Sequence, residues 1–86
     1  MTLAQNHPNP AGLVTTLRFT LPSARTVTLT VHDVMGRVVA IPVDHEFLPA
    51  GSHQRRVDLA RLSDGLYFYT LSGSGPAVTR RMIVAR

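Results

Sequence analysis

The strongest pattern in the chain is the stretch TVTLTVHDVMGR, residues 26–37. Valine and leucine alternate strictly with threonine over its first part, which is typical of a half-buried β-strand. Asp33 then stands at the first position of a turn and Gly36 at the last. An aspartate there can accept hydrogen bonds from the backbone that follows, and a glycine can adopt positive φ. The stretch therefore predicts a strand and a hairpin built on a type I turn with a glycine bulge.

The same alternation recurs on both sides of this hairpin, in residues 15–21, 37–43, 52–59, 66–71 and 78–84. No segment has a convincing helical period. This pattern predicts an all-β fold, an immunoglobulin-like antiparallel β-sandwich of six or seven short strands. The core is expected to hold the inward residues of each strand: Leu17, Phe19, Val27, Leu29, Val31, Val39, Ile41, Val57, Leu59, Tyr67, Tyr69, Leu71, Met82 and Val84.

Proline and glycine mark the expected turns. Pro49 stands at the second position of a turn that ends at Gly51. Residues 72–76 combine serine, glycine and proline and are expected to form the last turn. Pro42 lies within the third strand, which predicts an edge position or an early end for that strand.

Residues 62–67 are expected to turn a corner between the two sheets. In immunoglobulin-like sandwiches a tyrosine near the start of the sixth strand can donate its hydroxyl to upstream backbone. Tyr67, preceded by Leu62 and Gly65, stands at that place. The alternative is a sugar-binding platform made of the aromatic residues 67–69. Adjacent strand residues face opposite ways and cannot form one flat surface, so the structural role is favoured.

Residues 1–13 are expected to form a linker that leads into the domain, because Pro8 and Pro10 prevent a helix there. Residues 14–86 would then form the sandwich, since a chain of 86 residues has room for one domain. The first residues lack the basic and apolar stretches of a signal peptide. If the domain is exported, we therefore expect a longer precursor to carry the signal.

The charge pattern does not favour a nucleic-acid partner. The formal net charge is +4 and every Lys-or-Arg position holds arginine. These arginines are spread from Arg18 to Arg86, which favours a solvated surface. The chain has no cysteine, which excludes disulfides and Cys-ligated zinc. No apolar run approaches the length of a membrane span. We expect no nucleic-acid partner, no cofactor and no membrane-spanning segment.

The titratable residues do not form a recognisable catalytic or metal site. The four histidines do not pair at a metal-binding spacing, and His45 lies between Asp44 and Glu46 in what is expected to be a solvated loop. No serine occupies a strand-to-helix elbow. A β domain of this size rarely has the concavity of an enzyme. The sequence therefore predicts neither catalysis nor metal binding.

Six short motifs follow one another along the chain. They are QNHPNP (residues 5–10), TTLRFTL (15–21), VHDVMGR (31–37), LPAGSH (48–53), LSDGLYFY (62–69) and RRMIVAR (80–86). In this order and spacing they resemble the type A C-terminal sorting domain of the type IX secretion system, a family found in Bacteroidota. The differences are small: histidine stands at positions 7 and 32, where tyrosine is common, and arginine replaces lysine in the terminal strand.

This resemblance implies a non-catalytic signal that directs a larger secreted protein from the periplasm across the outer membrane to the cell surface. Its partners would be the type IX secretion machinery and a surface sortase-like protease that removes the domain. The cargo domain would lie upstream in the same chain.

The terminal strand is the expected recognition element. A strand at a sheet edge offers unpaired N–H and C=O groups to another chain, and the arginines beside it can be read by an acidic partner. Partner recognition is expected at Gly65, Tyr67, Arg80, Arg81, Met82, Ile83, Val84 and Arg86. Structural roles in turns or at the corner are expected at Asp33, Gly36, Arg37, Gly51 and Leu62.

Two other functions are compatible with the predicted fold. One is a passive immunoglobulin-like spacer or cap, such as the flagellar hook-cap β domain. The other is a carbohydrate-binding module that accompanies a glycoside hydrolase. The position of the domain in its precursor distinguishes these two functions from a sorting signal, because a sorting domain must be C-terminal while a spacer or sugar-binding module can lie anywhere.

Overall fold

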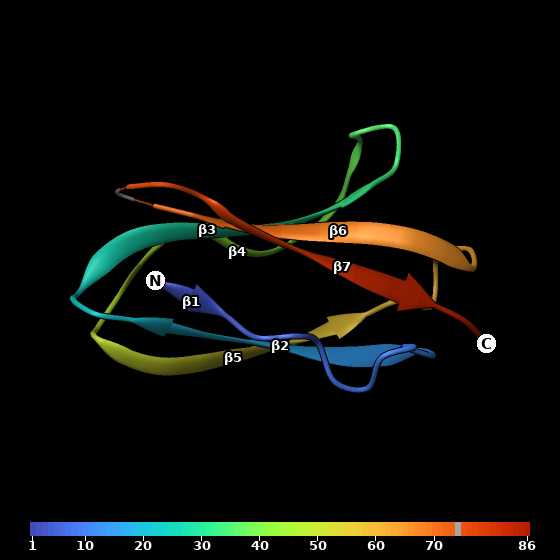
Figure 1. The fold of residues 1–86 in the computed structure, drawn as a ribbon, viewed down its shortest axis with the longest axis horizontal. Helices are drawn as coiled ribbons and strands as arrows, with labels where there is room; N and C mark the ends of the chain where they lie inside the picture. The colour runs from blue at the N-terminus through green and yellow to red at the C-terminus, as the bar shows by residue number, and fades with distance from the viewer. Residues whose placement is uncertain (74) are drawn as a thin grey trace.

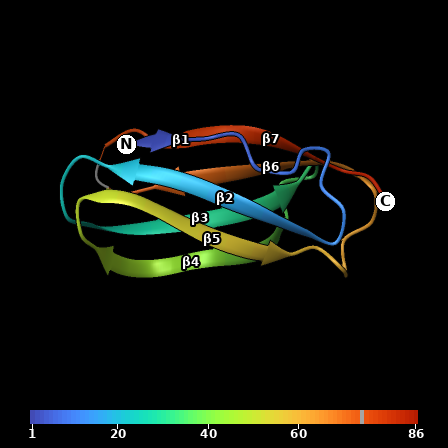
Figure 2. The same cartoon turned by 90° about the horizontal axis from the view of Figure 1, so that it is seen from below.

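The computed structural model describes residues 1–73 and 75–86, and within them it contains two packed antiparallel sheets and no helix (Figures 1 and 2). Sheet A has the strand order β1-β2-β5, and sheet B has the order β4-β3-β6-β7. The strands are β1 (Thr2–Leu3), β2 (Val14–Leu21), β3 (Arg25–Asp33), β4 (Val38–Leu48), β5 (Gly51–Asp58), β6 (Gly65–Ser72) and β7 (Val78–Val84). The predicted all-β sandwich of six or seven strands is confirmed.

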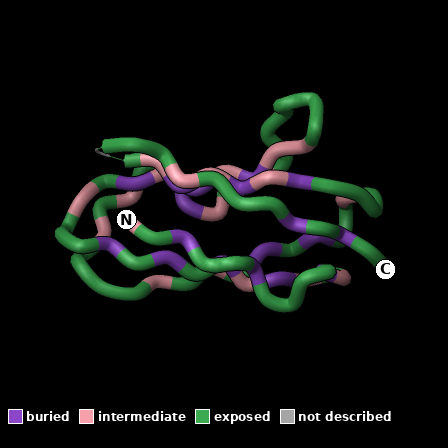
Figure 3. The backbone as a smooth tube through the Cα atoms, in the orientation of Figure 1, coloured by how far each residue is buried: buried purple, intermediate pink, exposed green. Residues whose placement is uncertain are grey.

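The core lies between the two sheets, where buried and exposed residues alternate along most strands (Figure 3). Every predicted core residue is buried except Val39 and Ile41. Leu3, Ala11, Leu21 and Val43 add to the same cluster. No helix able to cross a membrane is found in the part of the chain that the structure describes.

The prediction that Val39 and Ile41 are buried is wrong, because β4 does not keep a period of two. Its register against β3 shifts at three places between Val27 and His32. Each shift places an extra residue on β4, and a β-bulge of this kind turns the following side chains to the other face. The residues of β4 that face Val27, Leu29 and Val31 are therefore Glu46, Val43 and Ala40, three apart in the sequence. Val39 and Ile41 are 37% and 49% exposed.

The hairpin between β3 and β4 forms as the sequence predicts. The Gly36 amide donates to the Asp33 carbonyl at 3.0 Å, and the Asp33 amide donates to the Arg37 carbonyl at 3.0 Å. Gly36 has a φ of +83°, a conformation that costs glycine little and other residues more. Figure 1 shows this hairpin rising from sheet B, away from sheet A.

The N-terminal segment packs on the sandwich along its length. β1 pairs with β2, His7 forms a bridge with Thr16, and Ala11 forms a parallel bridge with Val84 of β7. Of the predicted turn over residues 72–76, Ser74 lies outside the described residues.

Candidate recognition site on the C-terminal strand

β7 is an edge strand of sheet B, and its residues alternate between the two faces. Met82 and Val84 point into the core and are 0% and 1% exposed. Arg81 and Ile83 point to the outer face and are exposed. The alternation expected from the sequence is therefore present in this strand.

The edge of β7 is not free over its C-terminal half, contrary to the expected row of unpaired groups. The Gln5 side-chain amide donates to the Arg81 carbonyl at 2.6 Å, and the Ile83 amide donates to Asn9 Oδ1 at 3.1 Å. The Ala11 amide donates to the Ile83 carbonyl at 2.7 Å. The N-terminal segment thus occupies the groups that a strand added by a partner would use here.

Arg80 holds β1 against the sandwich. Arg80 and Met82 are two residues apart on β7, so their side chains point to the same side of the strand, toward sheet A. There the Arg80 Nε donates to the Leu3 carbonyl at 2.6 Å. The Tyr69 hydroxyl acts nearby, donating to the Ala4 carbonyl at 2.7 Å and accepting from the Asn6 amide at 2.8 Å. Burial raises the pKa of Tyr69. These contacts connect β6 and β7 to the start of the chain.

The corner before β6 has the geometry that the sequence predicts for its tyrosine. The Tyr67 hydroxyl donates to the Ser63 carbonyl at 2.7 Å, and its ring is only 6% exposed. Gly65 begins β6 with a φ of +151°, a conformation that residues with a side chain rarely adopt. The Leu62 amide closes the preceding turn by donating to the Leu59 carbonyl at 2.9 Å.

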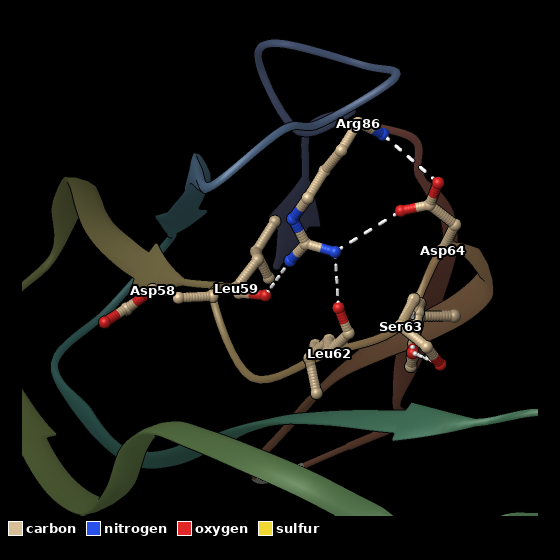
Figure 4. Close-up of polar contacts among 8 residues, drawn as sticks. Asp58, Leu59, Leu62, Ser63, Asp64 and Arg86 are labelled. Atoms are coloured by element: carbon tan, nitrogen blue, oxygen red, sulfur yellow. Dashed lines mark hydrogen bonds and ion pairs between the residues drawn. The ribbon is translucent and has the colours of Figure 1, made fainter.

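Arg86 fastens the end of the chain to the same corner (Figure 4). Its guanidinium donates to the carbonyls of Leu59 and Leu62 and to the Asp64 carboxylate, the last at 3.3 Å. Its backbone amide approaches the other Asp64 oxygen at 3.4 Å. Charged donors to carbonyls and carboxylates form the stronger class of hydrogen bond. The Arg86 side chain is therefore engaged within the domain.

The predicted recognition residues lie together on β7 and the neighbouring corner, but they differ in what they offer a partner. Arg81 and Ile83 present side chains to solvent. Met82, Val84 and Tyr67 are buried in the core. Arg80 and Arg86 hold other parts of the chain, as described above, and Gly65 has no side chain to present. Arg81 and Ile83 are therefore the exposed side chains of this set that make no side-chain hydrogen bond or ion pair within the described residues, whereas the exposed Arg80 and Arg86 are engaged within the fold.

Sequence reasoning did not identify the N-terminal residues that line this strand. Gln5, Asn9 and Ala11 form the contacts along its edge, and Asn6 is 3% exposed. One signal was available in this segment: polar residues alternate with Pro8 and Pro10. That pattern is compatible with an ordered extended segment and equally with a linker.

The described residues include no group of three or more His, Cys, Asp or Glu side chains placed to hold a metal ion. The acidic residues that do make contacts take part in turns and ion pairs, such as Asp33 with Arg37 at 2.9 Å and Glu46 with Arg55 at 3.3 Å.

A model for a family described as the secretion system C-terminal sorting domain matches residues 6–85 of the chain. No curated protein gave a significant match. The matched region begins within the N-terminal segment that lines β7 and extends nearly to Arg86.

Proposed function

The chain belongs to the secretion system C-terminal sorting domain family and is a sorting signal for the type IX secretion system, and on that premise we propose that the machinery reads β7 in the folded domain. The observation that carries the proposal is the exposure of Arg81 and Ile83 on a strand that Met82 and Val84 anchor in the core. The family is not catalytic. The domain acts as the sorting signal, and the secretion machinery that recognises it carries out transport.

Within this proposal, the other predicted recognition residues act by holding β7 in place. Met82 and Val84 anchor the strand in the core. Arg80 and Arg86 fix its two flanks to β1 and to the corner. Loss of any of them changes the conformation or position of the strand that the partner meets.

The proposed route runs from the periplasm to the cell surface. The cargo lies upstream of Met1, and a surface sortase-like protease separates it from the domain. A cut in the cargo linker before residue 2 would leave the packed segment of residues 2–11 intact. That position fits the hydrogen bonds of Leu3, Ala4 and Ala11, because proteases act most readily on segments without such contacts.

The test is a periplasmic reporter fused to the N-terminus of the domain in a bacterium with type IX secretion. The parent fusion should reach the cell surface, and the reporter alone should stay in the periplasm. Arg81→Glu should lower the surface fraction about tenfold, as loss of a central interface residue does. Arg56→Glu is the matched control, because Arg56 is exposed on the outer face of sheet A and its replacement changes the net charge equally.

Arg80 is excluded from this test. Its replacement by glutamate would place a carboxylate beside the Leu3 carbonyl and weaken the fold. Equal export of the parent, Arg81→Glu and Arg56→Glu fusions would contradict the role of β7, and retention of the parent in the periplasm would contradict the proposed route.

A further inference from the structure

The outer faces of the two sheets differ in chemistry. On sheet A the outward residues of β2 and β5 are polar or charged except for the half-buried Val14, and Arg18 donates a hydrogen bond to Gln54 at 3.2 Å. On sheet B, large apolar side chains are exposed instead: Val38, Val39, Ile41 and Phe47 on β4, Leu66 on β6 and Ile83 on β7. The bulges of β4 bring several of these side chains out of the core. A cluster of exposed apolar residues on one face only is the usual sign of an interaction surface.

One row of residues crosses all of sheet B at the end that carries the hairpin. Strand register places Arg81 beside Phe68, Phe68 beside His32, and His32 beside Val38, so each of the four strands contributes one residue. The rings of His32 and Phe68 stack with centroids 5.9 Å apart. Leu66 and Ile83 are partners in the neighbouring row. We call these six residues the distal face.

The raised hairpin borders the distal face. Val34 and Met35 at its tip are 64% and 78% exposed. A groove of about 250 Å³ lies between the tip and the corner, and its lining combines Leu66 with the charged residues Asp33, Arg37 and Asp64. The exposed apolar side chains of Val34 and Met35 therefore stand at one end of the distal face, beyond this mixed groove.

The composition of this surface fits a protein partner. Aromatic residues, methionine and arginine are enriched at protein interfaces, while lysine and acidic residues are depleted. The outward residues described on β3, β6 and β7 include Arg81 and His32 and no acid. Arg81 has no ion pair within the described chain. A partner that covers this face should supply a carboxylate to it, because an arginine buried without an acidic partner is costly.

We propose that the distal face docks a protein of the secretion machinery through an apolar surface that carries an acidic residue opposite Arg81. The inference rests on the proposed function and extends it from one strand to a sheet face. A second copy of this chain fits poorly, because the carboxylates that border its own distal face, Asp33 and Asp64, are already paired with Arg37 and Arg86. The upstream cargo also fits poorly, because β1 belongs to sheet A and the N-terminus lies toward the opposite end of the long axis from the hairpin (Figure 1).

The test changes apolar residues of the distal face and leaves Arg81 intact. In the reporter fusion, Val38→Thr combined with Leu66→Thr should lower the surface fraction about tenfold, since central interface residues dominate binding. Threonine favours strands, and both side chains are exposed, so the urea midpoint should match that of the parent. Phe47→Thr and Leu13→Thr are the matched controls, because they remove apolar side chains that are more exposed than Val38 and Leu66 but lie outside the distal face, and they should export normally.

Normal export of the doubly substituted, folded domain would overturn the docking face while leaving the proposed role of β7 standing. Retention of the parent fusion would instead overturn the proposed function. Two further measurements test other occupants of the face. A parent dimer in sedimentation that becomes a monomer on substitution would overturn the proposal in favour of self-association. Binding of the parent, but not the variant, to phosphatidylglycerol vesicles would overturn it in favour of a lipid surface.

Discussion

Asp33 organises the turn between β3 and β4 through both oxygens of its carboxylate. One oxygen accepts from the amides of Met35 and Arg37 at 2.9 and 3.0 Å, and the other accepts from the Arg37 guanidinium at 2.9 Å. The hydrogen bond from the Arg37 amide, together with those from the Arg37 guanidinium and the Met35 amide, holds the pKa of the Asp33 carboxyl below its ordinary value. The sequence predicted the turn because aspartate, glycine and their spacing suffice to specify it.

Asp33→Asn should change how stability depends on acid. A carboxyl whose pKa is lower in the folded state contributes stability above its unfolded pKa and loses that contribution as the pH falls through the folded pKa. The parent should therefore lose stability more steeply than the variant as the pH falls below about 4. Urea unfolding at a series of pH values measures this, and parallel profiles for the two proteins would contradict it.

Tyr67→Phe should lower the free energy of unfolding by about 0.5–1.5 kcal/mol, because it removes the donor of a part-buried hydrogen bond to the Ser63 carbonyl. The aromatic ring and its packing remain. Phe68→Tyr is a suitable control, because its ring lies on the outer face beside His32, where solvent can reach an added hydroxyl. Urea denaturation of both variants gives the comparison, and a loss below about 0.3 kcal/mol for Tyr67→Phe would show that the corner does not depend on this bond.

At the scale of elements, regular strands could be predicted and the bulged strand could not. β3 keeps its alternation from Thr26 to His32, and its inward residues are buried as expected. Alternation also predicted that Met82 and Val84 face the core. In β4, the positions of extra residues depend on pairing with β3 and on the positive φ of His45, +49°. No pattern within the strand itself encodes that pairing.

Two alanine substitutions distinguish the core side of sheet B from its outer side. Leu29→Ala should cost about 2–4 kcal/mol, since Leu29 is fully buried and the change leaves a cavity. Ile41→Ala should cost less than about 1 kcal/mol, because an exposed side chain loses little packing. Calorimetric or urea unfolding measures both. Equal losses would mean that Ile41 lies in the core and that the bulges are misplaced.

At the scale of the whole molecule, the N-terminal segment closes the sandwich. Leu3 and Ala11 belong to the core cluster, and Asn6 donates to the Pro8 carbonyl and to Thr15 Oγ1 at 2.9 and 3.0 Å. The sequence suggested a linker because prolines remove the alternation on which strand prediction depends. Several of the contacts that bind this segment join residues more than sixty positions apart, such as Asn6 and Tyr69. The alternation of residues within a short stretch of sequence cannot predict such long-range contacts.

Removal of residues 1–13 should therefore unfold the domain or leave it barely stable. The truncation exposes the core beneath Leu3 and Ala11 and takes away both partners of the Tyr69 hydroxyl. Together these losses are worth about 4 kcal/mol or more, and a domain of this size has little more than that to lose. His7→Ala in the full chain is the control, because His7 is exposed and its replacement should leave the urea midpoint nearly unchanged.

Limited proteolysis of a cargo fusion provides an independent measurement of whether residues 1–13 belong to the folded domain. Mass spectrometry should find the resistant fragment beginning at or before Thr2. A resistant fragment beginning at Val14, with the urea midpoint of the full domain, would show that residues 1–13 are a linker after all and that β7 carries a free edge for its partner.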